Sequence, residues 1–152
     1  MMIQNEAEYK STVLRAREQE QRLKQQAAEL KRTGLSKEQI KRVTDPLRAF
    51  HEQFKEEIES YERLMRGEFV ELQNLAGFGE LLIALRIAKG VTQRELAKRL
   101  DVSESQISRD ERNEYHGITI DRANCILEAL EVEITTEVAS LGRPRRMPSA
   151  RS

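Results

Sequence analysis

The residues with the most informative chemistry are polar side chains at close helical spacing in the middle of the chain: Glu104, Ser105, Gln106 and Arg109. An arginine can donate two hydrogen bonds to one guanine, and a glutamate can accept one from the amino group of cytosine. Serine and glutamine side chains can donate or accept. The same residue types occur on any solvated helix, so the surrounding elements must decide whether these side chains bind a partner or only face water.

Residue types that would support catalysis or metal binding are poorly placed. His51 and His116 are far apart, and neither stands at a metal-ligand spacing from Cys125. The glycines are scattered, and Gly77 and Gly79 alone are too few for a phosphate-binding loop. The many carboxylates fall in charge-patterned helices, where a solvated face is the ordinary interpretation. We therefore expect no enzyme, no metal site and no cofactor.

Two short helices are predicted around the polar residues, with only Asp101-Val102 between them. Thr92 is a good N-cap for the first helix, whose apolar residues share one face: Leu96, Ala97 and Leu100. Ser103 is a good N-cap for the second helix, and Gln106 stands where a capping box requires it. Two capped helices this close in sequence are typical of a helix-turn-helix, whose second helix enters the DNA major groove.

The stretch from 78 to 134 resembles the lambda repressor/Cro-like family, also called the xenobiotic-response-element family. The matched positions are Leu82, Leu85, Arg86, Gly90, Thr92, Gln93, Leu96, Ala97, Leu100, Val102, Ser103, Ile107, Ser108 and Glu111. This resemblance implies a small domain that binds double-stranded DNA. It also implies an ion pair between Arg86 and Glu111, which would join the first helix of the domain to the end of the recognition helix.

The same resemblance assigns a DNA-binding surface to both motif helices: Thr92, Gln93, Ser103, Glu104, Ser105, Gln106, Ser108, Arg109, Arg112 and Asn113. Gln93 matches a family glutamine that contacts a phosphate and braces the recognition helix. Residues 104, 105, 106 and 109 match the positions that face base edges. Arg112 and Asn113 are candidates for phosphate contacts.

The chain departs from the family pattern at two turn and helix positions. Asp101 stands where the family usually has glycine, although aspartate tolerates the left-handed conformation better than most residues. Asp110 stands where an apolar residue is usual, so we expect the end of the recognition helix to pack differently. Acidic residues also outnumber basic ones along residues 104–114, which disfavours tight phosphate binding by this helix alone.

Composition and charge limit the class of protein. The chain has 152 residues, 34% of them charged with equal numbers of each sign, which suits long solvated helices. The lone Cys125 excludes an internal disulfide, suits a reducing cytosol, and is expected to be a small buried core residue. Neither a membrane-spanning stretch nor a signal peptide is recognisable, so we expect a soluble cytoplasmic protein.

The N-terminal part, 1–75, predicts a long helical hairpin. Its first helix carries a heptad-like seam: Tyr9, Val13, Ala16, Glu20, Leu23, Ala27 and Leu30. Gly34 ends that helix, Ser36 to Gln39 is a capping box that opens a short helical segment, and Asp45-Pro46 is a second helix start. The next helix carries an apolar face: Leu47, Phe50, Phe54, Ile58, Tyr61, and Leu64 or Met65. We expect His51 at a solvated edge of this helix and a helical connection over 68–77.

Two interpretations of the hairpin remain open. It can join two chains into a homodimer, which would suit a helix-turn-helix that binds paired half-sites, or it can pack on its own domain and leave a monomer. A weaker similarity to HigA-type antitoxins, carried by the residues from Ile3 to Tyr9, by Asp45-Pro46 and by Ser60 to Glu62, would make a small protein toxin a partner.

The fold expected overall is all-α, with the hairpin followed by a five-helix-type helix-turn-helix domain over 76–141. Thr119 is a candidate cap for a helix after the recognition helix. The alternation from Val132 to Val138 predicts a short final strand, which could pair with a partner chain. Residues 142–152 are basic and contain two prolines, so they predict a flexible arm that either reaches DNA phosphates or a minor groove or has no role. The function expected is a dimeric transcriptional regulator, acting as a repressor, with the antitoxin as the alternative.

Overall fold

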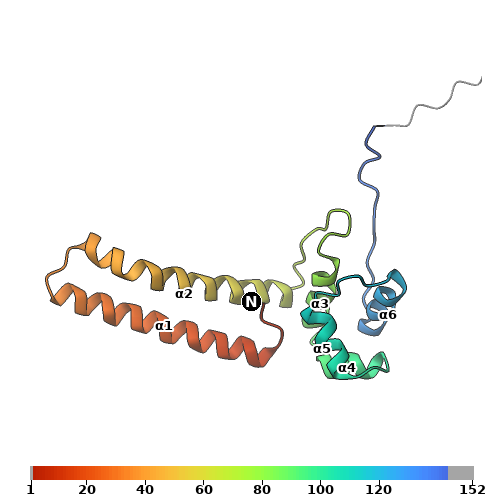
Figure 1. Cartoon of the computed structure of the whole chain (residues 1–152), viewed down its shortest axis with the longest axis horizontal. Helices are drawn as coiled ribbons and strands as arrows, with labels where there is room; N and C mark the ends of the chain where they lie inside the picture. The colour runs from red at the N-terminus through yellow and green to blue at the C-terminus, as the bar shows by residue number, and fades with distance from the viewer. Residues whose placement is uncertain (1, 144–152) are drawn as a thin grey trace, which may run out of the picture.

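The computed structural model describes residues 2–143, and within them all regular structure is helical. Figure 1 shows two long antiparallel helices, α1 (Glu6–Arg32) and α2 (Lys37–Met65), followed by a cluster of short helices. The short helices are α3 (Phe78–Ala88), α4 (Gln93–Arg99), α5 (Glu104–Arg112) and α6 (Ile120–Leu130). The all-α prediction is confirmed. Most of the basic arm lies outside the described residues.

Local sequence sets the ends of the hairpin helices. The side chain of Asn5 caps α1 by accepting from the backbone N–H of Glu8 at 2.8 Å. Thr33 ends α1, and Gly34 follows it with a φ of 84° in the left-handed region, as its position after the helix predicts. Both bonds of the Ser36–Gln39 capping box are present, so that prediction is also confirmed.

The second start predicted at Asp45-Pro46 is wrong, because α2 runs through Pro46 without a break. Proline in a helix interior removes one backbone hydrogen bond. Here the helix packs against α1 on both sides of the proline, with Thr44 buried before it and His51 buried after it. Tertiary packing therefore outweighs the local helix-breaking signal.

The apolar seams of α1 and α2 pair with each other within the chain. Tyr9 stacks on Tyr61 with ring centroids 4.9 Å apart, and the Tyr9 hydroxyl donates to Glu62 Oε1 at 2.7 Å. The prediction for His51 is wrong, because this side chain is buried in the seam and only 7% exposed. Phe50 lies beside the seam at 50% exposure and makes an edge-to-face contact with Phe54.

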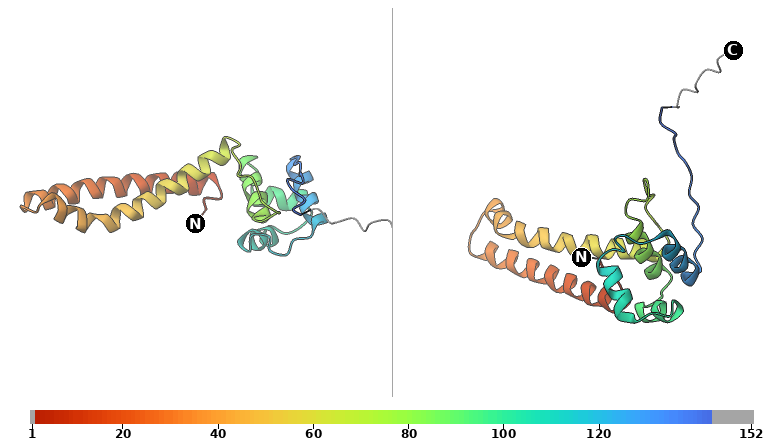
Figure 2. Two further views of the ribbon diagram at one scale, coloured as in Figure 1. Left: turned by 90° about the horizontal axis from the view of Figure 1, so that it is seen from above. Right: turned by 45° about the vertical axis from the view of Figure 1, so that its right-hand side comes forward.

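The short helices enclose the main core. Its fully buried side chains come from every helix after residue 78: Leu82, Ile83, Leu96, Ile107, Ile126 and Leu130. Ile3 and Tyr61 belong to the same buried cluster, so the open end of the hairpin packs on this domain. The views in Figure 2 agree, since the hairpin extends away from the domain while its open end lies against it.

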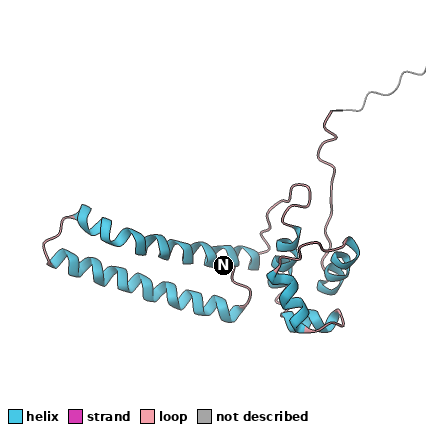
Figure 3. Ribbon diagram, viewed as in Figure 1, coloured by secondary structure: helices cyan, strands magenta, loops and turns pink. Residues whose placement is uncertain are grey.

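Several expectations for this half are corrected. Residues 78–131 form four helices where a five-helix type was predicted, and residues 132–138 are not a strand, as Figure 3 shows for the described part of the chain. A strand needs a ladder partner, and the described residues supply none for this segment.

The connection over 68–77 is irregular, with Asn74 and Leu75 in left-handed conformations. Cys125 is exposed, because α6 buries a different face that includes Ile126 and Leu130. None of the helices in residues 2–143 is long and apolar enough to cross a membrane.

Candidate nucleic-acid interface

The first motif helix, α4, begins at a complete capping box. Thr92 Oγ1 accepts from the backbone N–H of Glu95 at 3.1 Å, and the Thr92 N–H donates to Glu95 Oε2 at 2.8 Å. The bond from the Thr92 backbone is the main reason that the pKa of Glu95 lies below its usual value. These bonds fix the start of α4, where Gln93 was predicted to contact a phosphate.

The turn between α4 and α5 takes the conformation that the motif requires. Asp101 has a φ of 55°, so aspartate occupies a left-handed position that glycine would fill without strain. The N–H of Val102 donates to the carbonyl of Ala97 at 3.0 Å and closes the turn. Ser103 then caps α5, because its hydroxyl accepts from the N–H of Gln106 at 3.2 Å.

A buried hydrogen-bonded ion pair fixes α5 to the rest of the domain. Arg86 of α3 and Glu111 of α5 are joined by two bonds, one of them from Nη2 to Oε2 at 2.9 Å, and their side chains are 3% and 1% exposed. Arg86 Nη1 also donates to the carbonyl of Val91 at 2.8 Å. Gln93 Nε2 donates to Glu111 Oε2 at 2.6 Å. The predicted Arg86–Glu111 pair is present, and Gln93 braces the recognition helix through it.

The outward face of α5 follows from its buried face. Ile107 and Glu111 point into the core, so helical geometry places Ser105, Arg109 and Arg112 on the opposite face, and all three are exposed. Arg109 Nε donates to the carbonyl of Ser105 at 3.3 Å, one turn earlier on the same face. The structure therefore brings three of the predicted site residues together on one solvent-facing stripe.

The remaining predicted residues lie at the sides and ends of this stripe. Glu104 and Ser108 face a cleft between α5 and the open end of the hairpin. Gln106 is half-buried on the other side, toward α6. Asn113 is the exposed C-cap of α5, and Thr92, Ser103 and Gln93 lie at the starts of α4 and α5.

The cleft beside α5 has a volume of about 1060 Å³. Its walls come from the hairpin, including Tyr9 and Tyr61, and from α5, including Ser108 and Arg112. Charged residues of both signs line it, so its electrostatics alone do not select an anion. The cleft shows that the open end of the hairpin lies next to α5.

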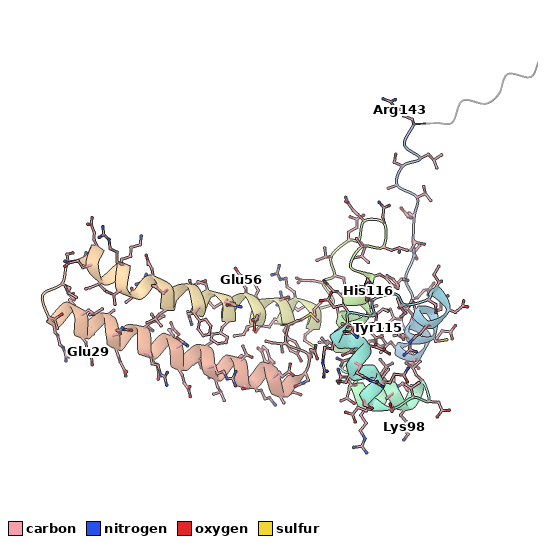
Figure 4. The ribbon with its side chains drawn as sticks, viewed as in Figure 1. Glu29, Glu56, Lys98, Tyr115, His116 and Arg143 are labelled. Carbon is pink, nitrogen blue, oxygen red and sulfur yellow. The ribbon has the colours of Figure 1, made fainter. Side chains whose placement is uncertain are left out.

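The turn after α5 depends on a close approach to α3. Glu114 and Tyr115 both have left-handed backbones, with φ of 51° and 52°. Figure 4 labels Tyr115 and His116 in this turn, and Tyr115 is buried. Burial raises the pKa of the Tyr115 hydroxyl. A Cβ on Gly79 would lie 1.8 Å from the carbonyl oxygen of Glu114, so this glycine has a packing role in α3.

Sequence reasoning missed Arg122 of α6. Its guanidinium bonds to Asp110, the residue that departs from the family pattern, and it also reaches Gln106. A signal for it was present, because a carboxylate at a usually apolar position needs a counter-charge nearby. Only the fold shows that the cation comes from the next helix.

The helices α4 and α5, the turn between them with Asp101 in the left-handed conformation, and the buried Arg86–Glu111 pair together form a helix-turn-helix. Residues 82–136 match the family model described as Helix-turn-helix, which leaves the hairpin outside the match. Searches of curated proteins and of solved structures found no match. The chain thus contains a helix-turn-helix domain of the Cro/C1 type, the xenobiotic-response-element family, and this class of domain binds DNA.

Proposed function

We propose that this protein is a cytoplasmic transcriptional regulator that binds specific sequences in double-stranded DNA as a dimer and acts as a repressor. The observation that carries the proposal is the exposed stripe of Ser105, Arg109 and Arg112 on a helix that a buried ion pair holds in place. A reading helix must be held rigidly if its side chains are to distinguish bases, and the Arg86–Glu111 pair supplies that support.

Arg109 is the principal base-reading residue of this proposal. Its bond to the Ser105 carbonyl uses Nε, while a bidentate contact to the O6 and N7 atoms of guanine can use the two Nη groups. Glu104 and Ser105 lie in the first turn of α5. The Glu104 carboxylate can accept from a neighbouring base, and the Ser105 hydroxyl can donate or accept. The remaining charge on this surface is mixed, so base contacts carry a large share of the affinity.

Phosphate contacts are assigned to the ends of the two motif helices. Thr92 and Gln93 stand at the start of α4, and Arg112 and Asn113 stand at the end of α5. Contacts to phosphate fix the register of the protein on the duplex without carrying sequence information. Gln93 would make its contact while its amide still braces Glu111, which links phosphate binding to the position of α5.

A dimer suits this domain because a helix-turn-helix generally binds two half-sites. The seams predicted to join two chains are occupied within one hairpin, so the contact between copies must use other apolar residues. Val43 and Phe50 on α2 are about half exposed and provide one such surface beside the seam. Repression then requires only that the bound dimer cover a promoter.

Selection of bound fragments from a random duplex pool by the full chain tests this function, with light scattering at micromolar concentration as the test of stoichiometry. We expect an enriched sequence with two related half-sites and a particle of twice the chain mass. Enrichment of a single half-site by a monomer would overturn the dimer. A pool that stays random would overturn sequence-specific binding and favour the antitoxin alternative, in which the hairpin holds a protein partner.

A further inference from the structure

Gln106 of α5 and Arg122 of α6 form a contact beside the reading face of the recognition helix. In the amide orientation that satisfies both ends of Gln106, its side-chain oxygen accepts from Nη1 and from Nη2 of Arg122, each at 3.2 Å. Gln106 is half-buried against α6, so the interacting oxygen points toward the protein and away from the outward stripe.

The guanidinium of Arg122 is itself held from the other side. Its Nη2 donates to Asp110 Oδ2, one turn after Gln106 on α5. Its backbone belongs to the first turn of α6, which Thr119 caps by accepting from the Arg122 N–H at 3.2 Å. A planar guanidinium with donors in a fixed fork can satisfy a carboxylate and an amide oxygen together. The position of Arg122 is therefore fixed by two helices.

This contact changes what Gln106 can offer to DNA. A glutamine amide has one oxygen that accepts and one NH2 group that donates. Recognition of adenine in the major groove uses both, since the amide accepts from N6 and donates to N7. With the oxygen engaged by Arg122, Gln106 retains only its donors.

We propose that Arg122 is a positioning residue that makes Gln106 a donor-only reader, so that the base pair facing Gln106 is selected for acceptors, above all the O6 and N7 of guanine. This inference rests on the proposed function, because it assumes that α5 enters the major groove. Adenine offers one acceptor and one donor at that edge, and a donor-only amide cannot pair with both. The selected base is therefore guanine, and adenine is disfavoured.

The test compares base preferences of full-length variants on the duplex selected by the unaltered protein. Gln106→Ala first locates the base pair, as the position whose preference disappears. Arg122→Ala then releases the amide oxygen, and we expect the preference at that one position to move from guanine toward adenine by about tenfold. In Gln106→Ala/Arg122→Ala the shift must vanish, because it acts through the amide.

Arg99→Ala is the matched control. Arg99 also ties a motif helix to α6, through Nη1 to the carbonyl of Ala129 at 2.8 Å, but it does not contact a predicted reading residue in the described structure. A merely structural loss should lower affinity at all positions in both variants and leave each preference unchanged. Arg122→Lys keeps a charge for Asp110 without the fork, so it gives the same shift in a smaller amount if Arg122→Ala does not fold.

The outcomes separate the inference from the function beneath it. If the Arg122→Ala and Arg122→Lys variants both fold and keep the same base preference at the pair that faces Gln106, that result contradicts the role of Arg122 but leaves DNA reading by α5 intact. A strong adenine preference in the unaltered protein at that position does the same. A failure of the unaltered protein to select any sequence contradicts the proposed function itself.

Discussion

The hairpin and the helix-turn-helix domain differ in how their buried ionisable side chains are paired. In the domain, Arg86 and Glu111 are both almost wholly buried, and each has two residues as hydrogen-bond partners. In the hairpin, His51 is buried in the seam and its Nδ1 atom lacks a partner among the described residues. The domain also has one such atom, the hydroxyl of Tyr115, beside its paired network. A satisfied polar network specifies one geometry, while an unsatisfied group costs stability. The buried Arg86–Glu111 pair therefore fixes one geometry for α3 and α5, whereas the buried imidazole of the hairpin adds no such constraint.

The largest effect should come from breaking the buried pair. Glu111→Ala leaves the Arg86 charge buried without its carboxylate, so we expect the free energy of unfolding to fall by about 3–5 kcal/mol. Chemical denaturation followed by circular dichroism measures this loss. Glu52→Ala removes the exposed Glu52–Lys55 pair of the hairpin and should change little, since both side chains are more than half exposed. Equal losses in the two variants would contradict the contrast between the regions.

A second prediction concerns the close approach of α3 to the turn after α5. Gly79→Ala places a methyl group 1.8 Å from the carbonyl oxygen of Glu114, so helix and turn must separate, at a cost of about 3 kcal/mol. A thermal melt checks this value. Gly67→Ala is the comparison, because its Cβ meets open space and only the positive φ opposes it. A loss at Gly79 no larger than that at Gly67 would show that the turn yields easily.

A third prediction is that a substitution in the hairpin raises the stability of the fold, whereas the two substitutions in the domain lower it. His51→Leu replaces a buried, unsatisfied imidazole by an apolar side chain, and we expect a gain of about 1 kcal/mol. His116→Leu, at an exposed position in the turn after α5, serves as the control and should leave the melting temperature nearly unchanged. A marked loss in His51→Leu would mean that this imidazole has a partner that stabilises the fold.

The smallest effect concerns the end of α6. Glu131 caps this helix with a φ of 56°, a conformation that costs a non-glycine residue about 1–2 kcal/mol. Glu131→Gly removes that strain, but glycine loses more chain entropy on folding, by about 0.5–1 kcal/mol. The expected gain is about 0.5 kcal/mol, seen as a small rise in melting temperature. A fall would indicate that the Glu131 side chain contributes a stabilising contact.

Local signals in the sequence predicted much of this architecture. Thr92, Ser103 and Thr119 cap their helices as predicted, because a cap depends only on residues within one turn. The core face of α4 and the Arg86–Glu111 pair were also predicted, the pair through the family resemblance. The continuity of α2 through Pro46 was not predictable, since it depends on packing against another helix.

The candidate site also contains some residues that local sequence could place and others that depend on contacts between separate segments. The helix that carries Arg109 and Ser105 could be placed from its caps and its buried Ile107. Arg122 and the packing role of Gly79 could not, because both act across contacts between separate segments. The strand predicted over 132–138 failed for a related reason, since alternation describes a half-buried surface and does not supply a partner strand.

The central claim is that the exposed stripe of α5 reads bases. The most direct test measures the affinity of Arg109→Ala for the selected duplex and for random duplexes at one salt concentration. We expect a loss of about 1–3 kcal/mol on the selected duplex, a relaxed preference at one base pair of each half-site, and little change on random DNA. Gln93→Ala should weaken binding to both, because a phosphate contact carries no base identity. An equal loss for Arg109→Ala on both duplexes would make Arg109 a phosphate anchor and would contradict the claim that this face of α5 reads the sequence.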